Sequence, residues 1–464
     1  MAKKIIQEKK LTEEQALVAK DIQKFLKNKH QKFITLSASA GCGKSFLISE
    51  VLKKYDKNGD PYIPSYVVGI TYTHMARLNL STSIPNSISY ASAVGMKMEE
   101  GDNDYDPLDM KFKGNPSLER LANYRIFVID ECSMLTADAI DLLVDYVRDD
   151  AKFIFLGDPK QLPPIGIDGD NDSPVFKYPT VTLKTPIRQE PDDEIYKVSC
   201  LIGEMIYGNI PPDFTKIPKK SIQKNGKGFA FTNKDKAIDS FVNKVKNGQD
   251  AIMCTFTNKI RKDINIEVRN RLWGNGESVH PLEGDLLIGT NQYNPKGRMI
   301  KDKFIQYEEP IFYNGQRFTI DKIKMKKLKA FYKSSIPDFG YAKRILDVVG
   351  DGFDVWHIKS SSLKSSINVL CDHDKQRWFK ARRMLGEYCK YVVGNFAYLN
   401  QFTSKFASVD YGYCVTLYKV QGGTYDYVYV DYNDVMNCTG LSTKRKLQSL
   451  YVAMTRPKIN LALF

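Results

Sequence analysis

The sequence has 464 residues, which is too many for one ordinary hydrophobic core and predicts two to four domains. Lys and Arg number 68 against 54 Asp and Glu, and this net charge of +14 favours a polyanionic partner such as nucleic acid, although many basic proteins bind none. No run approaches the roughly 18 apolar residues of a membrane span, and the basic N-terminus lacks the apolar stretch of a signal peptide, so we expect a soluble, cytoplasmic protein.

The first third of the chain alternates strand-like and helical patterns. A helix is predicted at 13–28, with Val18, Ile22, Phe25 and Leu26 on one face. Buried strands are predicted at 32–38, 66–71, 125–130 and 152–157, and helices at 43–54, 73–80 and 136–148. Strands that alternate with helices in this way indicate an α/β fold around a parallel sheet.

The segment ASAGCGKS, at 38–45, joins the first of these strands to a helix, which is the context of a phosphate-binding P-loop. Its glycines would let backbone N–H groups point at phosphate oxygens at the helix N-terminus. Lys44 would neutralise the β- and γ-phosphates, and the Ser45 hydroxyl would bind Mg²⁺. An accidental glycine turn is the alternative. The residues predicted to bind the nucleotide here are Ala40, Gly41, Cys42, Gly43, Lys44 and Ser45.

Two acidic residues follow the buried strand IFVID, at the end where α/β sheets bind ligands. We predict that Asp130 helps to hold Mg²⁺, through water or the Ser45 hydroxyl, and that Glu131 polarises the attacking water. Such a pair alone means little, but its position about 85 residues after a P-loop makes it a strong indication of an ATPase.

A third motif, FLGDPKQLPPI, occupies 155–165 and again follows a strand. The amide of Gln161 could sense the γ-phosphate, and the Pro163–Pro164 pair stiffens the loop that carries it. A plain turn rich in Gly, Asp and Pro is the alternative.

A second alternation occurs late in the chain. Strands are predicted at 251–256, 427–431 and in the final segment INLALF, and helices near 258–272 and 443–454. The simplest interpretation is a second α/β domain, split by an insertion at 276–411. Within it, lysines alternate with apolar residues from 322 to 326, which fits either a solvated edge strand or a DNA-facing one. A smaller acidic insertion occupies 95–120.

The three motifs, in this order and with the sequences DECSM and GDPKQLPP, resemble superfamily 1 helicases of the RecD/Dda branch, and the length and insertions look most like the Dda type of T-even bacteriophages. The resemblance implies two RecA-like motor domains with parallel sheets, at 1–190 and at 191–275 with 412–464. It also implies a strand-separating pin at 95–120 and an SH3-like, β-rich insertion at 276–411, where LEGDLLIG and YNGQRFTI resemble that subdomain.

The resemblance also assigns roles in the first motor domain. Gln15, in LTEEQ, would read the adenine edge, although Thr12 and Gln15 also form a helix capping box. Arg188 would reach the γ-phosphate. Motif Ib is degraded, because Ala91 replaces the usual His. Residues expected to contact DNA in this domain are Thr73, His74, Ser92 and Pro163.

In the second domain, LYVAMTRPK resembles motif VI, with Arg456 as a second arginine finger, a role that suits a side chain able to pair with phosphate bidentately. VTLYKVQGGTYD resembles motif V, with Tyr418 where the family has His, and there Gln421 and Gly422 would link the strand to the nucleotide. The residues expected to grip DNA are Phe256, Thr257, Asn258, Thr416 and Lys419.

Together these features predict an ATP- and Mg²⁺-dependent DNA helicase that acts as a monomer on single-stranded and forked DNA. The resemblance implies 5′-to-3′ travel, a step of about one nucleotide per ATP, and a role in phage-type replication or recombination, with a single-strand-binding or replisome protein as a candidate partner. Three alternatives stay open. They are a RecD-like subunit of a larger recombination complex, a nucleic-acid-binding module with a relict ATPase site, and an RNA track.

Overall fold

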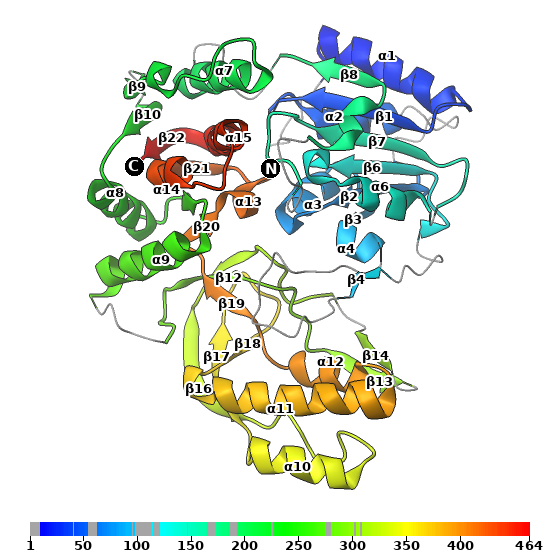
Figure 1. Cartoon of the computed structure of the whole chain (residues 1–464), viewed down its shortest axis with the longest axis vertical. Coiled ribbons are helices and arrows are strands. Elements are labelled where there is room, and N and C mark those ends of the chain that lie inside the picture. Colours follow the sequence, from blue (N-terminus) through cyan, green and yellow to red (C-terminus); the bar gives the residue numbers. More distant parts are fainter. Residues whose placement is uncertain are drawn as a thin grey trace, which may run out of the picture. The chain divides into compact units, whose positions relative to one another are not determined.

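The computed structural model describes residues 10–39, 41–53, 63–94, 96–97, 113–114, 121–145, 147–164, 172–185, 193–223, 226–274, 280–300, 303–306 and 309–464 (Figure 1). The chain divides into two compact units. Unit 1 is Met1–Ile260 with Thr416–Phe464, and unit 2 is Arg261–Val415. None of the helices in the described ranges has both the length and the apolar character that crossing a membrane requires.

The first sheet of unit 1 contains six parallel strands in the order β3-β2-β6-β7-β1-β8 (Figure 1). Their bounds are β1 Phe33–Ala38, β2 Val67–Thr71, β3 Ser87–Ser89, β6 Ile126–Asp130, β7 Lys152–Gly157 and β8 Thr180–Leu183. The central strands are apolar on both faces and are buried on both faces, as parallel strands covered by helices must be. The carboxyl ends of β1, β2, β6 and β7 lie at one edge of the sheet. There Thr71 pairs in register with Asp130, and Ser37 pairs with Gly157.

Helices cover this sheet, and we call sheet and helices lobe one. They are α1 Glu13–Lys27, α2 Lys44–Lys53, α3 His74–Ser81, α4 Tyr90–Ala93 and α6 Ala137–Val144. The predicted apolar face of α1, with Val18 and Ile22 among its residues, is buried against α2 and β8 (Figure 1). The predicted helix at 136–148 was too long, because α6 ends at Val144, where the Asp145 N–H bonds to the Asp141 carbonyl.

The second sheet of unit 1 forms lobe two, within 193–260 and 416–464. Its strands run in the order β11-β21-β22-β10-β9, parallel except for β9 at the edge. Their bounds are β9 Lys220–Ile222, β10 Gly228–Phe231, β11 Ala251–Thr255, β21 Tyr425–Val430 and β22 Pro457–Leu463. The helices are α7 Glu194–Tyr207, α8 Lys234–Lys246, α13 Leu417–Val420, α14 Tyr432–Asn437 and α15 Thr443–Met454. α9 (Asn258–Trp273) and β20 (Cys414–Thr416) contain the points where the chain passes between the units.

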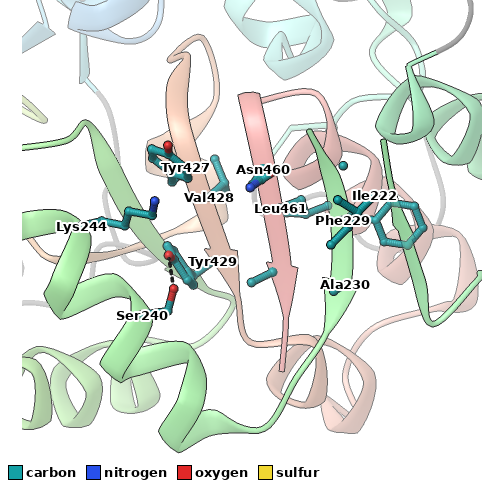
Figure 2. Close-up of a pocket in the computed structure, with 12 residues that line it drawn as sticks. Ile222, Phe229, Ala230, Ser240, Lys244, Tyr427, Val428, Tyr429, Asn460 and Leu461 are labelled. Atoms are coloured by element: carbon teal, nitrogen blue, oxygen red, sulfur yellow. Dashed lines mark hydrogen bonds between the residues drawn. The ribbon is translucent and has the colours of Figure 1, made fainter. Parts of the chain in front are cut away.

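A surface hollow of about 160 Å³ lies on the second sheet beside α8 (Figure 2). Small side chains such as Ala230 and Ala462 leave this space, and Tyr427 and Tyr429 border it. Tyr429 forms a hydrogen bond of 2.9 Å with the Ser240 hydroxyl. None of the residues predicted to bind nucleotide or DNA lines this hollow.

In its described residues, unit 2 combines small antiparallel sheets with three α-helices in addition to most of α9. The sheets contain β12 Leu286–Gly289, β15 Arg317–Thr319 and β19 Val409–Tyr411; β13 Gly297–Ile300 and β14 Lys303–Gln306; and β16 Lys322–Leu328, β17 Phe353–Lys359 and β18 Ile367–Leu370. The helices are α10 Phe339–Val349, α11 Lys375–Tyr388 and α12 Ala397–Thr403. The prediction of a β-rich insertion was therefore incomplete. The helices bury Ile345, Leu385 and Phe402 in one core with Phe353 of β17, which the strand patterns did not indicate.

The structure describes the alternating lysines of the larger insertion and a part of the smaller insertion. β16 contains the alternating lysines, and its Lys327 pairs with Asp354 on β17 at 3.2 Å, while both interpretations of the strand stay open. In the smaller insertion, β4 (Met96–Lys97) pairs antiparallel with β5 (Lys113–Gly114), and the rest of 95–120 lies outside the described residues. The domain limits predicted at 190, 275 and 411 stay predictions.

Candidate nucleotide site

The P-loop leaves β1 and enters α2 through two glycines with left-handed backbone. Gly41 has φ 85° and Gly43 has φ 77°, a region that side-chain-bearing residues rarely adopt. The Lys44 ammonium donates to the carbonyl oxygens of Ala38, at 2.8 Å, and Ser39, at 3.4 Å. Lys44 is thus held over the loop at the N-terminus of α2, where a phosphate would be bound. Ala40 lies outside the described residues.

Gln15 is buried and connects the N-terminus of α1 to the P-loop. Its side-chain carbonyl accepts from Thr12 N–H at 3.1 Å, and the Thr12 hydroxyl accepts from Gln15 N–H at 3.2 Å, which confirms the capping box. Its amide donates to the Cys42 carbonyl at 3.2 Å. Both ends of the side chain are therefore engaged, and recognition of adenine by Gln15 stays a prediction.

The acidic pair lies at the end of β6, as predicted. Asp130 accepts from the Glu131 N–H at 2.9 Å. Glu131 has φ 55°, and it is the one residue other than glycine with positive φ among the described residues. Left-handed backbone at such a residue is costly and is characteristic of functional sites. Burial raises the pKa of Asp130 to about 6, assisted by the charge of Glu131 and opposed by Lys44.

Asp130→Asn should make the nucleotide-free protein more stable. The pKa of Asp130 is higher in the folded chain than in the unfolded chain, so its ionised form costs stability. The loss of folding stability reaches its full size well above pH 6, where Asp130 is ionised, and it decreases as the pH falls through 6. We expect a melting temperature roughly 2 °C or more above that of the unmodified protein at pH 7.5, and about half that gain at pH 5.

The control for this prediction is Asp150→Asn. Its hydrogen bond from Arg148 lowers the pKa of Asp150, so its charge favours the folded state and its removal should bring no gain. A melting temperature of Asp130→Asn at or below that of the unmodified protein at pH 7.5 would show that the Asp130 charge is not a cost.

Gln421, in motif V, joins the two lobes. Its side chain is fully buried, and its amide donates to Gln161 at 3.0 Å and to Glu131 at 3.2 Å, with a longer contact to Ser133 at 3.4 Å. The Gln421 side-chain oxygen is buried without a hydrogen-bond partner in the described structure. One lobe-two amide thus contacts both the predicted sensor and the predicted base of lobe one.

Gly422 lies next to α3. Its φ is 80°, and its carbonyl accepts from Asn79 at 2.9 Å. An added Cβ would come within 3.2 Å of Ala76 and 3.4 Å of the Thr73 hydroxyl, so the position has little room for a side chain. Gly422 thus joins motif V to the predicted DNA-contacting segment, and its role in nucleotide binding stays a prediction.

Arg456 is buried just beyond the end of α15. Its guanidinium donates to the carbonyls of Val452, at 3.0 Å, and Gly423, at 3.3 Å, and to the Thr455 hydroxyl at 2.8 Å. Burial lowers the pKa of Arg456, and the charge of Glu131 acts in the opposite direction. Arg456 is therefore turned away from solvent, and it is near enough to the lobe-one carboxylate of Glu131 for that charge to act on it. Arg188 lies outside the described residues.

The lobe-one residues predicted to contact DNA form local structure here. The Thr73 hydroxyl caps α3 by accepting from Ala76 N–H at 3.2 Å, and the Ser92 hydroxyl lies 2.8 Å from that of Ser89. Pro163 is buried. The side chain of His74 lies outside the described part of the structure. Their contacts with DNA stay predictions.

In lobe two, Asp434 holds the predicted gripping segment. Its carboxylate accepts from the N–H groups of Phe256 and Thr257 at 2.7 and 2.8 Å and from the Thr257 hydroxyl at 2.9 Å. Asp434 was not among the predicted residues, because it lies 177 residues from Thr257, on α14. Of the remaining predicted residues, Asn258 and Lys419 are exposed and Thr416 is half-buried.

The chain is similar to several known proteins. Residues 23–167 match a family model described as an AAA domain. An uncharacterized protein of Acanthamoeba polyphaga mimivirus is 24% identical over 492 residues, covering 95% of this chain and 97% of that protein. The ATP-dependent DNA helicase PIF1 of Saccharomyces cerevisiae (strain YJM789) is 30% identical over 218 residues, or 43% of this chain and 24% of that protein.

A solved structure of Pif1 helicase from Bacteroides, in complex with ADP-AlF3 and single-stranded DNA, matches 98% of this chain and 92% of its own with a TM-score of 0.53 at 15% identity. This chain has the fold of a Pif1-type helicase. The predicted fold class, two RecA-like parallel sheets with smaller antiparallel sheets, is confirmed. Membership of superfamily 1 and of its RecD/Dda branch stays a prediction. The activity of an ATP-hydrolysing DNA helicase stays a prediction from the motifs.

Proposed function

We propose that this Pif1-type chain binds ATP at the junction of its two lobes and uses its hydrolysis to move 5′ to 3′ along single-stranded DNA and unwind duplex. The observation that carries the proposal is the contact of Gln421 with both Gln161 and Glu131. A group on lobe two that contacts the sensor and the base of lobe one can transmit the state of the nucleotide to lobe two. The Bacteroides Pif1 structure contains a nucleotide analogue and single-stranded DNA, the two ligands proposed here.

The described residues fit a Mg²⁺–ATP complex. Ser45 lies in the first turn of the phosphate-binding helix α2, and Asp130 offers a half-buried carboxylate near Lys44. Both would hold Mg²⁺, which neutralises phosphate charge. The proposed role of Glu131 is to take a proton from the attacking water, and its left-handed backbone is of the kind found at functional sites. Gln161 and Arg456 would donate hydrogen bonds to the terminal phosphate group from opposite lobes.

A ligand shifts a conformational equilibrium only by its differential affinity for the two forms. A terminal phosphate bound by Lys44 of lobe one and Arg456 of lobe two favours the form in which both reach it, and hydrolysis removes that preference. Movement of the lobes would pass to DNA through Gly422, which contacts α3, and through the segment held by Asp434. Alternate grip of the strand then turns each cycle into a step.

The biological setting of the activity is a separate proposal. From the length and insertion pattern, we propose that the chain works alone, as a Dda-type enzyme, in phage-type replication or recombination. A RecD-like subunit of a larger complex is the second candidate, and it differs in needing partner chains for unwinding.

Unwinding of forked duplexes with a single tail tests the proposal. With the purified chain, ATP and Mg²⁺, forks with only a 5′ tail should separate, and forks with only a 3′ tail should not. Equal or faster separation from the 3′ tail would overturn the direction. ATP turnover that single-stranded DNA stimulates, without unwinding of either fork, would favour the RecD-like subunit. ATP turnover that only RNA stimulates would show that the chain moves on RNA rather than on DNA.

A further inference from the structure

The loop that carries Gln161 is a tight turn, Asp158–Gln161, which we call the sensor turn. The Gln161 N–H donates to the Asp158 carbonyl at 3.0 Å, and the Lys160 N–H donates to one Asp158 carboxylate oxygen at 3.1 Å. Asp158 is buried, with 1% of its surface exposed. Because a buried carboxylate needs partners for both oxygens, the second oxygen must be satisfied from outside the turn.

That partner comes from the other lobe. The hydroxyl of Tyr451, on α15, donates to the second carboxylate oxygen of Asp158 at 2.7 Å. Tyr451 is itself buried, and its hydroxyl lies near the Ser39 side chain of the P-loop. Burial, with the charge of Asp158, raises the pKa of Tyr451 far above its ordinary value, so the hydroxyl keeps the proton that it donates.

The rest of the sensor turn also contacts lobe two. The Gln448 amide, one helical turn before Tyr451, donates to the Pro159 carbonyl at 3.4 Å. The Lys160 ammonium lies 5.3 Å from the centre of the Tyr451 ring and 5.6 Å from that of Tyr207 on α7. Three consecutive residues of the turn are therefore held by lobe two, and the Tyr451–Asp158 bond is the shortest of these contacts.

The arginine proposed as a finger comes just after the same helix. Arg456 follows α15 and donates to the Val452 carbonyl of its last turn, so its position depends on that of the helix. Gln161 closes the sensor turn, so its position depends on that of Asp158. We propose that the Tyr451–Asp158 hydrogen bond is a positioning contact that aligns Gln161 of lobe one with Arg456 of lobe two for hydrolysis. This inference rests on the proposed function.

Tyr451→Phe tests the inference, because it removes one hydroxyl and keeps the ring. Single-strand-stimulated kcat should fall about tenfold or more, the scale of a lost hydrogen bond to a charged group, while KM for ATP stays within about threefold. Affinity for ADP with aluminium fluoride, which resembles the transferring phosphate, should fall by a similar factor, and affinity for ADP alone should hold. A residue that only stabilised the fold would not separate these quantities.

Asp158→Asn and the double variant complete the measurement. If the two residues act as a unit, the double variant should lose no more kcat than the worse single variant. The matched control is Tyr429→Phe, which removes a buried hydroxyl bonded to Ser240 on the same lobe, beside the hollow on the second sheet (Figure 2). Its kcat should stay within about twofold of the unmodified protein.

Separate outcomes overturn the two proposals. Absence of single-strand-stimulated turnover in the unmodified protein would remove the proposed function and this inference with it. With normal turnover there, a kcat of Tyr451→Phe within twofold, or additive losses in the double variant, would overturn the positioning role alone. The positioning role would also be overturned if Tyr451→Phe lost equal affinity for ADP and for ADP with aluminium fluoride. It would be overturned as well if Tyr429→Phe lost as much kcat as Tyr451→Phe.

Discussion

Lys44→Ala is expected to lower strand-stimulated ATP hydrolysis by at least about 10²- to 10³-fold while leaving single-strand binding largely intact. The Lys44 ammonium lies over the P-loop, bonded to the Ala38 carbonyl at 2.8 Å, and alanine leaves no cation for the β- and γ-phosphates. The residues predicted to hold DNA lie elsewhere in both lobes. Steady-state turnover with a saturating oligonucleotide, and fluorescence anisotropy of the labelled strand, measure the two properties.

A lysine at the other end of the same helix provides the control. Lys53 closes α2 and pairs with Glu50 at 2.9 Å on a partly exposed surface, where such pairs contribute little. Lys53→Ala should hydrolyse ATP at nearly the unmodified rate. Normal turnover in Lys44→Ala would remove the P-loop assignment, and with it the nucleotide site.

Arg456→Ala should lower turnover by about 10³-fold or more if the guanidinium stabilises the transferring phosphate from lobe two. Arg456→Lys keeps the charge but loses the planar fork, so it should recover only part of the rate. Since Arg456 is buried and bonded to Val452 and Gly423, melting temperatures of both variants must accompany the kinetics.

Lys458→Ala is the control for this series. Lys458 lies two residues beyond Arg456, is exposed, and pairs with Asp426 at 3.0 Å. Its loss should leave turnover within about twofold, as expected for an exposed ion pair. A loss below tenfold in a folded Arg456→Ala protein would make Arg456 a structural residue that bonds to Val452, Gly423 and Thr455 around it.

Local pattern was enough to predict the two parallel sheets. Strands such as β6 and β7 are buried on both faces, so their sequences are continuous apolar runs, and each is followed by turn residues. The same reasoning placed Lys44 at the start of a helix and the Asp130–Glu131 pair at the end of a strand. These features depend on residues that are neighbours in sequence, and such features can be predicted from one sequence.

Contacts between distant segments could not be predicted in this way. Gln161 and Gln421 are 260 residues apart, and Asp158 and Tyr451 are 293 apart, so no local pattern pairs them. Asp158 and Tyr451 both occur in motifs that the sequence analysis quoted, but neither received a role, because a buried carboxylate and its hydroxyl partner are identified only in three dimensions. The helices α10 and α11 of unit 2 were not predicted, although their buried residues recur at helical spacing, as Ala342, Ile345 and Val349 do in α10.

The strand order of lobe two has a consequence for how the protein is made. β10 ends at Phe231, and the strands that lie between it and β11 are β21 and β22, which begin at Tyr425 and Pro457. A ribosome that adds about 5–20 residues per second needs roughly 10–40 s to cross the 190 or so residues between β10 and β21. During that interval β10 and β11 have backbone N–H and C=O groups whose partner strands have not been made, so both strands can pair wrongly or be bound by chaperones. All strands of the lobe-one sheet, in contrast, have already been made.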